Sequence, residues 1–292
     1  MNTRLSLLAC VAVLYFPPVE AKTPIEESRP IPADGLVEID NLAGSIEITT
    51  WDKPEVHVSG ELGEDVEKLE IQESSAGVKI HVRNRQDQRN VDETILRVQV
   101  PATVSVQVES VSADLAVRGL DGNSLVFDTV SGDLAAEVQT QRLEVETVSG
   151  DVSFAGATPR ASVETVSGEI NLRGIEGEVA ISSVSGDVIL LGSRIVRGRF
   201  ETVSGDVQLT LDVAARGRFN AESMSGDVRL RLPSGQEAEY SAQSYSGDIA
   251  SDFGEVTANS PGPGHSLSFQ QGENGATIRI ESFSGDISIT AP

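Results

Sequence analysis

The sequence predicts an all-β protein built as a single-stranded β-solenoid, with coils of about 18–21 residues. Three observations support this prediction. A Ser-Gly-Asp motif recurs at a nearly constant interval, strand-like alternation of apolar and polar residues flanks each copy, and helical periodicity is almost absent from the repeats. Repeats of this length and composition are typical of a solenoid, in which each coil packs on its neighbours.

The motif glycines set the length of the repeat. Their spacings are 18, 18, 18, 19, 21, 21 and 38 residues. They are Gly132, Gly150, Gly168, Gly186, Gly205, Gly226, Gly247 and Gly285. The last spacing indicates a coil that lost its motif or was replaced by an insertion. The drift away from 18 residues, and the failure of an apolar-every-sixth rule, disfavour a left-handed β-helix and favour a right-handed or irregular solenoid.

The first residues predict export. Residues 1–21 contain Arg4, an apolar run over 5–16 and Ala21 at the expected cleavage position. We therefore expect a secretory signal peptide over 1–21, a linker over 22–33, and a periplasmic, extracellular or cell-surface location. A competing interpretation takes Leu-Leu-Ala-Cys as a lipobox, with a lipid anchor on Cys10. In the exported chain no cysteine remains for a disulfide, and we expect no transmembrane segment.

The rest of the chain is expected to form one continuous domain in two parts. Residues 34–108 form an irregular β part, in which NLAGSIEI (41–48) resembles a motif copy. Residues 109–292 form the regular part, and VSADL around Ala113 is a degenerate first copy. The last coil is expected to be the uncapped end of the rod, which makes end-to-end association of two copies an expected contact.

Within a regular coil, Leu143 and Val145 alternate before the motif, and Val152 and Phe154 alternate after it. Val148 breaks this parity, but its position is apolar in every copy, and we therefore expect that column to lie in the core. The column comprises Val111, Val130, Val148, Val166, Val184, Val203, Met224, Tyr245 and Phe283. The preceding Ser/Thr column is expected to form a hydroxyl ladder between coils.

The motif itself has the chemistry of a corner. Glycine adopts sharp backbone conformations without a steric cost, and Ser and Asp side chains bind backbone groups that a turn leaves unpaired. Coils stacked about 4.8 Å apart would also align the acids in a row, which is a candidate collective binding face. That row comprises Asp133, Asp151, Glu169, Asp187, Asp206, Asp227, Asp248 and Asp286.

The charge of the chain restricts its partners. There are 45 Asp and Glu residues against 22 Lys and Arg, a formal net charge of −23. We expect such an acidic chain to bind nucleic acid and anionic lipid poorly, because both partners are negatively charged. Cationic peptides and divalent cations remain candidates. Calcium takes carboxylate oxygens, but the motif lacks the spacing of an EF-hand or a calcium-binding β-roll. We therefore favour the corner role and assign no cofactor or metal site.

Catalytic signals are weak. The histidines His57, His81 and His265 are scattered, and the chain contains no Gly-x-Ser-x-Gly elbow or phosphate-binding loop. We assign no catalytic or cofactor-binding residue and predict a protein that is not an enzyme. The alternative is a glycan-active β-helix enzyme, a polysaccharide lyase or hydrolase, which a cleft of non-repeated acids beside Arg or Lys would support.

These segments together resemble a known family. DGLVEIDNLAGSIEITTWDKPEVHVSG, then VQVPATVSVQVESVSADLAVRGLDG, then serial TVSGD repeats, are similar to the bacterial putative-adhesin β-strand-repeat family. This is a Toastrack-like domain of unknown function related to head-domain autotransporter adhesins. The resemblance runs from about residue 34 to the end. It implies an exported right-handed β-solenoid at the cell envelope, linked in some lineages to envelope stress, with no catalytic residues to carry over.

We therefore predict a non-enzymatic exported solenoid that serves as an interaction, adhesion or cell-envelope scaffold surface. Its expected partner is an envelope protein, a cationic peptide or another surface ligand.

Overall fold

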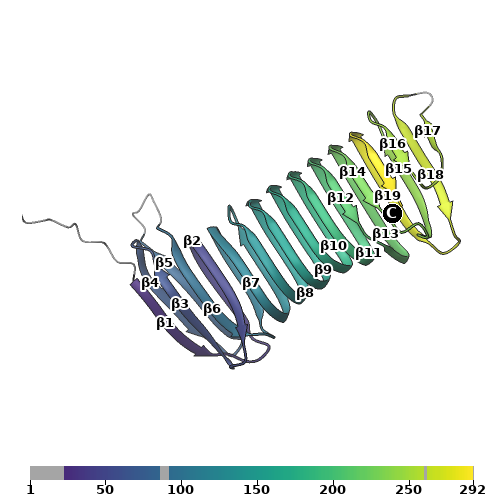
Figure 1. Cartoon of the computed structure of the whole chain (residues 1–292). Helices are drawn as coiled ribbons and strands as arrows, with labels where there is room; N and C mark the ends of the chain where they lie inside the picture. The colour runs from purple at the N-terminus through teal and green to yellow at the C-terminus, as the bar shows by residue number, and fades with distance from the viewer. Residues whose placement is uncertain (1–22, 86–91, 260–261, 292) are drawn as a thin grey trace, which may run out of the picture.

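The computed structural model describes residues 23–85, 92–259 and 262–291, and in these ranges it contains strands and turns but no helix. The chain forms a long flat rod in which the strands lie side by side like rungs (Figure 1). The all-β prediction is confirmed, and the rungs stack mainly in parallel, as a solenoid requires. The signal peptide and Cys10 lie outside the described residues. No described helix is long and apolar enough to cross a membrane.

Five long strands form the regular rungs. They are β7 (Ser105–Thr129), β8 (Leu134–Ser149), β9 (Val152–Ser167), β10 (Ile170–Ser185) and β11 (Val188–Ser204). Each strand pairs in parallel with the next along the chain. Strands β8 to β11 each start directly after one Ser-Gly-Asp or Ser-Gly-Glu corner and run to the serine of the next. The motif is therefore the corner between consecutive rungs.

Each rung bends in the middle and buries one side of both halves. In β8, Leu134, Ala136 and Val138 are buried on one side of the bend, and Leu143 and Val145 on the other. The register shifts at these bends, for example between Arg173 and Ile175 in β10. Apolar residues recur at every second position, and their side chains fill a continuous core that runs the length of the rod.

The C-terminal part changes the order of the rungs. Its strands are β12 (Val207–Thr210), β13 (Val213–Ser225), β14 (Val228–Arg231), β15 (Ala238–Ser244), β16 (Ile249–Ser251), β17 (Val256–Ala258), β18 (His265–Gln271), β19 (Ala276–Ser284) and β20 (Ile287–Thr290). The last rung, β19 with β20, pairs with β13 and β14 on one side. On the other side it pairs with β15 and β16. The final rung in sequence is therefore inserted between two earlier ones (Figure 1).

This order corrects the expectation that the last coil is the uncapped end. Strand β15 forms the end rung instead, and β18 covers it in an antiparallel arrangement, with β17 paired to β18. Residues 252–275 thus account for the 38-residue spacing as an insertion. The chain leaves the rod after β16, covers its end, and returns to complete the rung beneath.

The N-terminal end combines parallel and antiparallel pairs. Its strands are β1 (Thr23–Pro30), β2 (Leu36–Trp51), β3 (Glu55–Leu62), β4 (Val66–Glu73), β5 (Gly77–Asn84) and β6 (Thr94–Pro101). Strands β5 and β6 lie parallel to β2, whereas β1 pairs antiparallel with β3, β3 with β6, and β4 with β5. Strand β2 lies parallel to β7, with Gly44 opposite Ala113 and Ser45 opposite Asp114. The two degenerate motif copies therefore do align as corners. The expected linker over 22–33 is wrong, because β1 pairs with β3 along its full length.

Candidate functional site

The corners stack so closely that only glycine fits at their centre. Gly226 has a φ of +146°, and a Cβ atom there would lie 2.2 Å from the carbonyl oxygen of Gly205. The same approach recurs along the rod, with Gly285 against Gly226 and Gly247 against Gly285. The conformational and packing need for glycine explains why this residue is kept in all regular corners.

The motif acids form the predicted row, and each also has a structural role. The backbone N–H of Asp151 donates to Oδ1 of Asp133 at 2.8 Å, and that of Glu169 donates to Oδ1 of Asp151 at 2.8 Å. We call this series the aspartate ladder. Its other steps join Asp133 to Asp114, Asp206 to Asp187, Asp227 to Asp206, Asp286 to Asp227 and Asp248 to Asp286.

The ladder is interrupted once. Among the described residues, the step from Glu169 to Asp187 is the one between successive rungs at which no such bond forms, although the backbone carbonyl of Asp187 still accepts the N–H of Ile170. A glutamate carboxylate stands one methylene farther from the backbone than an aspartate carboxylate. Wherever a motif carboxylate accepts the backbone N–H of the next corner, the motif acid is therefore aspartate.

The column before the motif serine is not in the core. The side chains of Val111, Val130, Val148, Val166, Val184, Val203, Met224, Phe283 and Tyr245, in spatial order, are 45–57% exposed. We call this column the apolar ridge. At its C-terminal end the rings of Tyr245 and Phe283 stack with centroids 5.7 Å apart. The expectation of a buried column was wrong.

The cause is that strand alternation continues up to the corner. Val145 and Thr147 both point inward in β8, and Val148 must then point outward. The threonine column is buried, but no hydroxyl ladder is found among the described residues. In this column, the buried hydroxyl oxygens without a hydrogen-bond partner belong to Thr129, Thr147, Thr165, Ser183, Thr202 and Ser282. Ser244 instead donates to the carbonyl of Gly285 at 3.1 Å.

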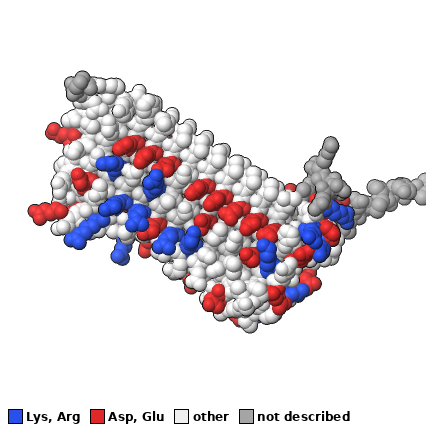
Figure 2. All heavy atoms as spheres, turned by 180° about the vertical axis from the view of Figure 1, so that it is seen from behind, with Lys and Arg blue, Asp and Glu red and all other residues white. Residues whose placement is uncertain are grey.

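A second row of acids lies two residues before the ridge. Its members are Glu109, Asp128, Glu146, Glu164, Glu201, Glu222 and Glu281, and we call this row the acidic rail. Within it, Glu201 pairs with Arg199. Burial raises the pKa of the Asp128 carboxyl above its ordinary value, and the nearby carboxylates of Glu146 and Glu109 raise it further. Figure 2 shows acidic side chains in a row along one face, beside an uncharged edge of the rod.

One arginine partly neutralises the ladder. Arg229 Nη1 lies 2.7 Å from Asp206 Oδ2, and its Nη2 lies 2.6 Å from Asp227 Oδ2. The hydrogen bond from Arg229 lowers the pKa of the Asp206 carboxyl. No other Lys or Arg forms an ion pair with the motif acids in the described ranges. The corner edge therefore combines an apolar ridge with an excess of negative charge on both sides.

The described residues contain no candidate metal centre. They include no group of three or more His, Cys, Asp or Glu residues placed to hold a metal ion. The histidines are far apart in the fold. His57 contacts Ser28, His81 contacts Asp40, and His265 contacts the carbonyl of Gly247.

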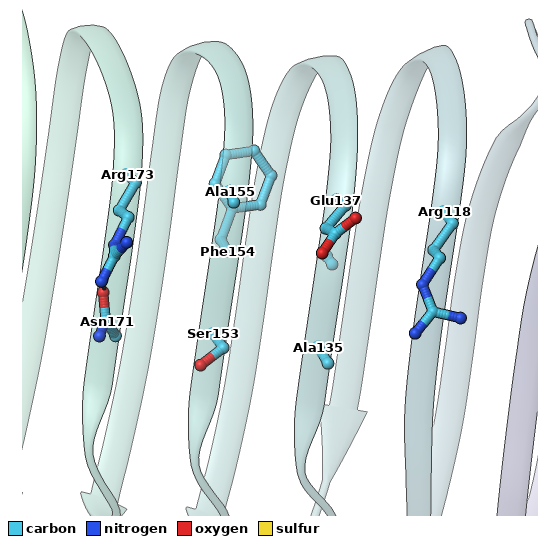
Figure 3. A pocket seen from close by; sticks show the side chains of 9 residues that line it. Arg118, Ala135, Glu137, Ser153, Phe154, Ala155, Asn171 and Arg173 are labelled. Atoms are coloured by element: carbon cyan, nitrogen blue, oxygen red, sulfur yellow. Dashed lines mark hydrogen bonds between the residues drawn. The ribbon is translucent and has the colours of Figure 1, made fainter.

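A shallow depression of about 200 Å³ lies on the flat face of β7 to β10. Figure 3 shows Arg118 and Arg173 on its outer rungs, with Glu137 and Ser153 on the rungs between. Glu137 is the one carboxylate that lines it. Hydrolysis of a glycosidic bond generally needs a pair of carboxyl groups on either side of the bond. This depression lacks that pair. A larger depression of about 430 Å³ at the N-terminal end is lined by Asp40, Glu109 and Arg83, so the glycan-active alternative stays a prediction.

Comparison with known proteins gives one family. The family model described as Toastrack DUF4097 matches residues 36–228 and 215–290. A search of curated proteins found no match.

Several solved structures are similar to this chain over most of its length. A "putative adhesin" from Bacteroides fragilis is 12% identical, with a TM-score of 0.43, over 92% of this chain and 98% of that one. A "putative adhesin" from Parabacteroides distasonis is 11% identical, with a TM-score of 0.39, over 92% and 98%. A "putative lipid binding protein" from the same species is 13% identical, with a TM-score of 0.41, over 91% and 96%.

Proposed function

The chain belongs to the Toastrack DUF4097 family, and from this premise we propose that it is a non-enzymatic exported scaffold that binds another envelope component along the corner edge of its rod. Export and the envelope location rest on the sequence of residues 1–21. Adhesion is the function that the names of several similar structures suggest. The proposal does not depend on those names, because the surface of this chain supports it independently.

The observation that carries the proposal is the apolar ridge. A single exposed valine needs no explanation, whereas a contiguous exposed apolar strip marks an interaction surface in a soluble protein. Here nine successive rungs each place an apolar side chain at the same outward position. The outward positions beside it, such as Glu146 and Ser149, are polar.

A purely structural explanation of the ridge is that neighbouring valines pack on one another and stabilise the corners. Cross-strand contacts between β-branched side chains do contribute to sheet stability. This explanation does not require the side chains to remain half exposed in every rung, and it does not account for Met224. The two explanations differ in whether the ridge contacts another molecule in the cell.

The test is site-specific crosslinking in the living cell. A photo-reactive amino acid replaces Met224 on the ridge or, as the control, Val196, which is 50% exposed but lies at the bend of β11. We expect a discrete crosslinked species from the Met224 position that the Val196 position does not give. Identical products from both positions, or none from either, would contradict the proposed function.

A further inference from the structure

The ridge, the acidic rail and the aspartate ladder lie side by side along the same edge. In most rungs the chain passes from a rail acid to the ridge residue, then through Ser-Gly to the ladder acid, as in Glu146, Val148 and Asp151. Ser182 and Gln243 take the place of the rail acid in two rungs. Eight steps of roughly 4.8 Å make the ridge about 38 Å long. One apolar strip of this length therefore has carboxylates along both sides.

A second copy of the chain is a poor occupant for this edge. Ridge against ridge would bury roughly 400 Å² on each copy, below the size of a stable dimer interface. It would also bring two acidic rails and two aspartate ladders together on chains of net charge −23. Both the small area and the like charge oppose self-association here.

Charge complementarity points to a basic partner with an apolar stripe. Along the rail, Asp128, Glu146 and Glu164 occupy three adjacent rungs, and none of them forms an ion pair with a Lys or Arg of the described chain. The raised pKa of Asp128 reflects this unbalanced negative charge as well as its burial. Cations placed over these carboxylates would relieve the repulsion between them.

The spacing of the ridge favours a helix over an extended peptide. An α-helix rises about 5.4 Å per turn, close to the rung spacing of about 4.8 Å. Over three or four turns, each turn can therefore set one apolar side chain against one ridge residue, and along the full ridge the helix lags by about one rung. A strand laid along the rod would present a side chain to the ridge only every 6.5–7 Å or so. The width of a helix, about 10 Å, would bring flanking Lys or Arg side chains over the rows of acids.

From these features we propose that the apolar ridge binds a basic amphipathic helix of about 25 residues, lying along the rod with its apolar stripe on the ridge and its cations over the acidic rail and the aspartate ladder. This inference rests on the proposed function and specifies the partner for the same edge. The small contact area predicts weak binding that falls as salt rises.

The experiment uses the exported chain and a synthetic Leu/Lys peptide of about 25 residues, with leucines at helical three- and four-residue spacing. Two comparison peptides are a scrambled sequence of the same composition and a Leu/Glu version. Binding is measured by fluorescence anisotropy at low and high salt. We expect only the Leu/Lys amphipathic peptide to bind appreciably, and its affinity to fall as salt is raised.

Two variants separate the apolar and the charged contributions. The ridge variant carries Val148→Thr, Val166→Thr and Val184→Thr, which keep the β-branched shape, and its control carries Leu191→Thr and Val196→Thr at exposed apolar positions off the ridge. The rail variant carries Asp128→Asn, Glu146→Gln and Glu164→Gln. Its control carries Glu239→Gln, Glu255→Gln and Glu273→Gln, with the same change in net charge. We expect each test variant to lose about tenfold or more in affinity and each control to bind like the parent.

Several results would overturn the inference. Equal binding of the scrambled peptide would show general charge attraction, and undiminished binding by the ridge variant would place the contact elsewhere. Ridge-dependent binding to zwitterionic lipid vesicles, without peptide binding, would identify a membrane as the occupant. If the Met224 crosslink forms in cells but the Leu/Lys peptide does not bind, the proposed function stands and the helical partner is wrong. If the peptide binds in solution but no crosslink forms in cells, the edge has the chemistry to hold a basic helix, but the proposed function fails and the inferred cellular partner fails with it.

Discussion

At the scale of single residues, the motif aspartate illustrates how one side chain serves both the fold and the surface. One oxygen of Asp151 accepts the backbone N–H of Glu169 in the next rung, while the residue remains exposed. A corner leaves backbone N–H groups without a ladder partner, and the carboxylate supplies the missing acceptor. The fold thus requires a row of acids, and that row is available to a cationic partner as a consequence.

The aspartate ladder predicts opposite effects for two substitutions. Asp151→Ala removes the acceptor for the N–H of Glu169 and should lower the free energy of unfolding by about 1 kcal/mol. Glu169→Asp supplies the acceptor that the Asp187 N–H lacks and should raise it by about 0.5 kcal/mol or more. Urea unfolding measures both. Asp151→Asn, which keeps an acceptor oxygen, is the control, and a loss equal to that of Asp151→Ala would contradict a hydrogen-bonding role.

Asp128 predicts a dependence of stability on pH. Its pKa is raised in the fold by burial and by Glu146, so the folded state binds this proton more tightly than the unfolded state. The free energy of unfolding should therefore fall as pH rises from the unfolded pKa of about 4 through the folded pKa. Asp128→Asn should stabilise the chain at pH 7 and make no difference below about pH 4.

Thermal unfolding of Asp128→Asn and of the parent across this pH range checks the prediction. Glu273→Gln, at an exposed position outside the acidic rail, is the control for loss of one negative charge. A stabilisation by Asp128→Asn that persists at low pH would show that the effect does not come from titration of this carboxyl.

Residue identity and strand parity gave conflicting signals at the ridge, and parity decides the structure. Val148 is apolar and was expected inside, whereas Thr147 is polar and is buried. The backbone of a strand points successive side chains to opposite faces whatever their chemistry. The sequence did contain the signal, because positions 143, 145 and 147 continue one alternation. A threonine can take an inward position near a corner, where its methyl group packs against the core.

At the scale of the strands, the rung order shows what a repeat cannot specify by itself. Every regular rung carries the same motif and nearly the same alternation, so the rung β19–β20 is compatible with any neighbour. The stacking of individual rungs was therefore predictable, and their spatial order was not. The 38-residue spacing was the one signal of an irregularity, and it marked the strands β17 and β18 that cover the end.

The inserted rung predicts an unusual pattern of hydrogen exchange. In a simple solenoid the last coil frays first, since it has a neighbour on one side only. Here Ile278 and Ile280 of β19 are fully buried between β13 and β15. Mass-spectrometric deuterium labelling should find β19 as protected as β13, and more protected than β18. Rapid exchange throughout β19 and β20, with β13 and β15 still protected, would contradict the inserted position.

At the scale of the whole molecule, both ends of the rod are closed by antiparallel strands. At the N-terminal end, β1 and β4 are outermost and carry several exposed charged residues, such as Glu26 and Lys68. At the C-terminal end, β18 covers β15, and the buried ring of Tyr240 stacks on Phe253 with centroids 4.9 Å apart. Charged outer strands and covering segments are established ways to prevent edge-to-edge pairing.

Because both ends are closed, we expect the rods not to associate end to end. End-to-end association, as expected from the sequence, requires the last rung in sequence, β19 with β20, to be exposed at the end of the rod, whereas this rung is internal. We predict that the full exported chain is a monomer by size-exclusion chromatography with light scattering. Like charge on two acidic rods adds to the effect of the covered edges.

Removing the cover should create the association that the complete chain avoids. Residue 254 lies shortly after the end of β16, and residue 275 lies directly before β19. A short Gly-Ser bend can therefore replace the segment between them and leave all rungs in place. The deletion exposes the backbone edge of β15 and one face of Tyr240, whose ring centroid lies 6.2 Å from that of Phe269 in β18. Because β15 then offers unpaired N–H and C=O groups, two copies can pair end to end. A mass that rises with protein concentration for the deletion variant, and not for the parent, is the expected result; a monomeric deletion variant would show that charge alone keeps the rods apart.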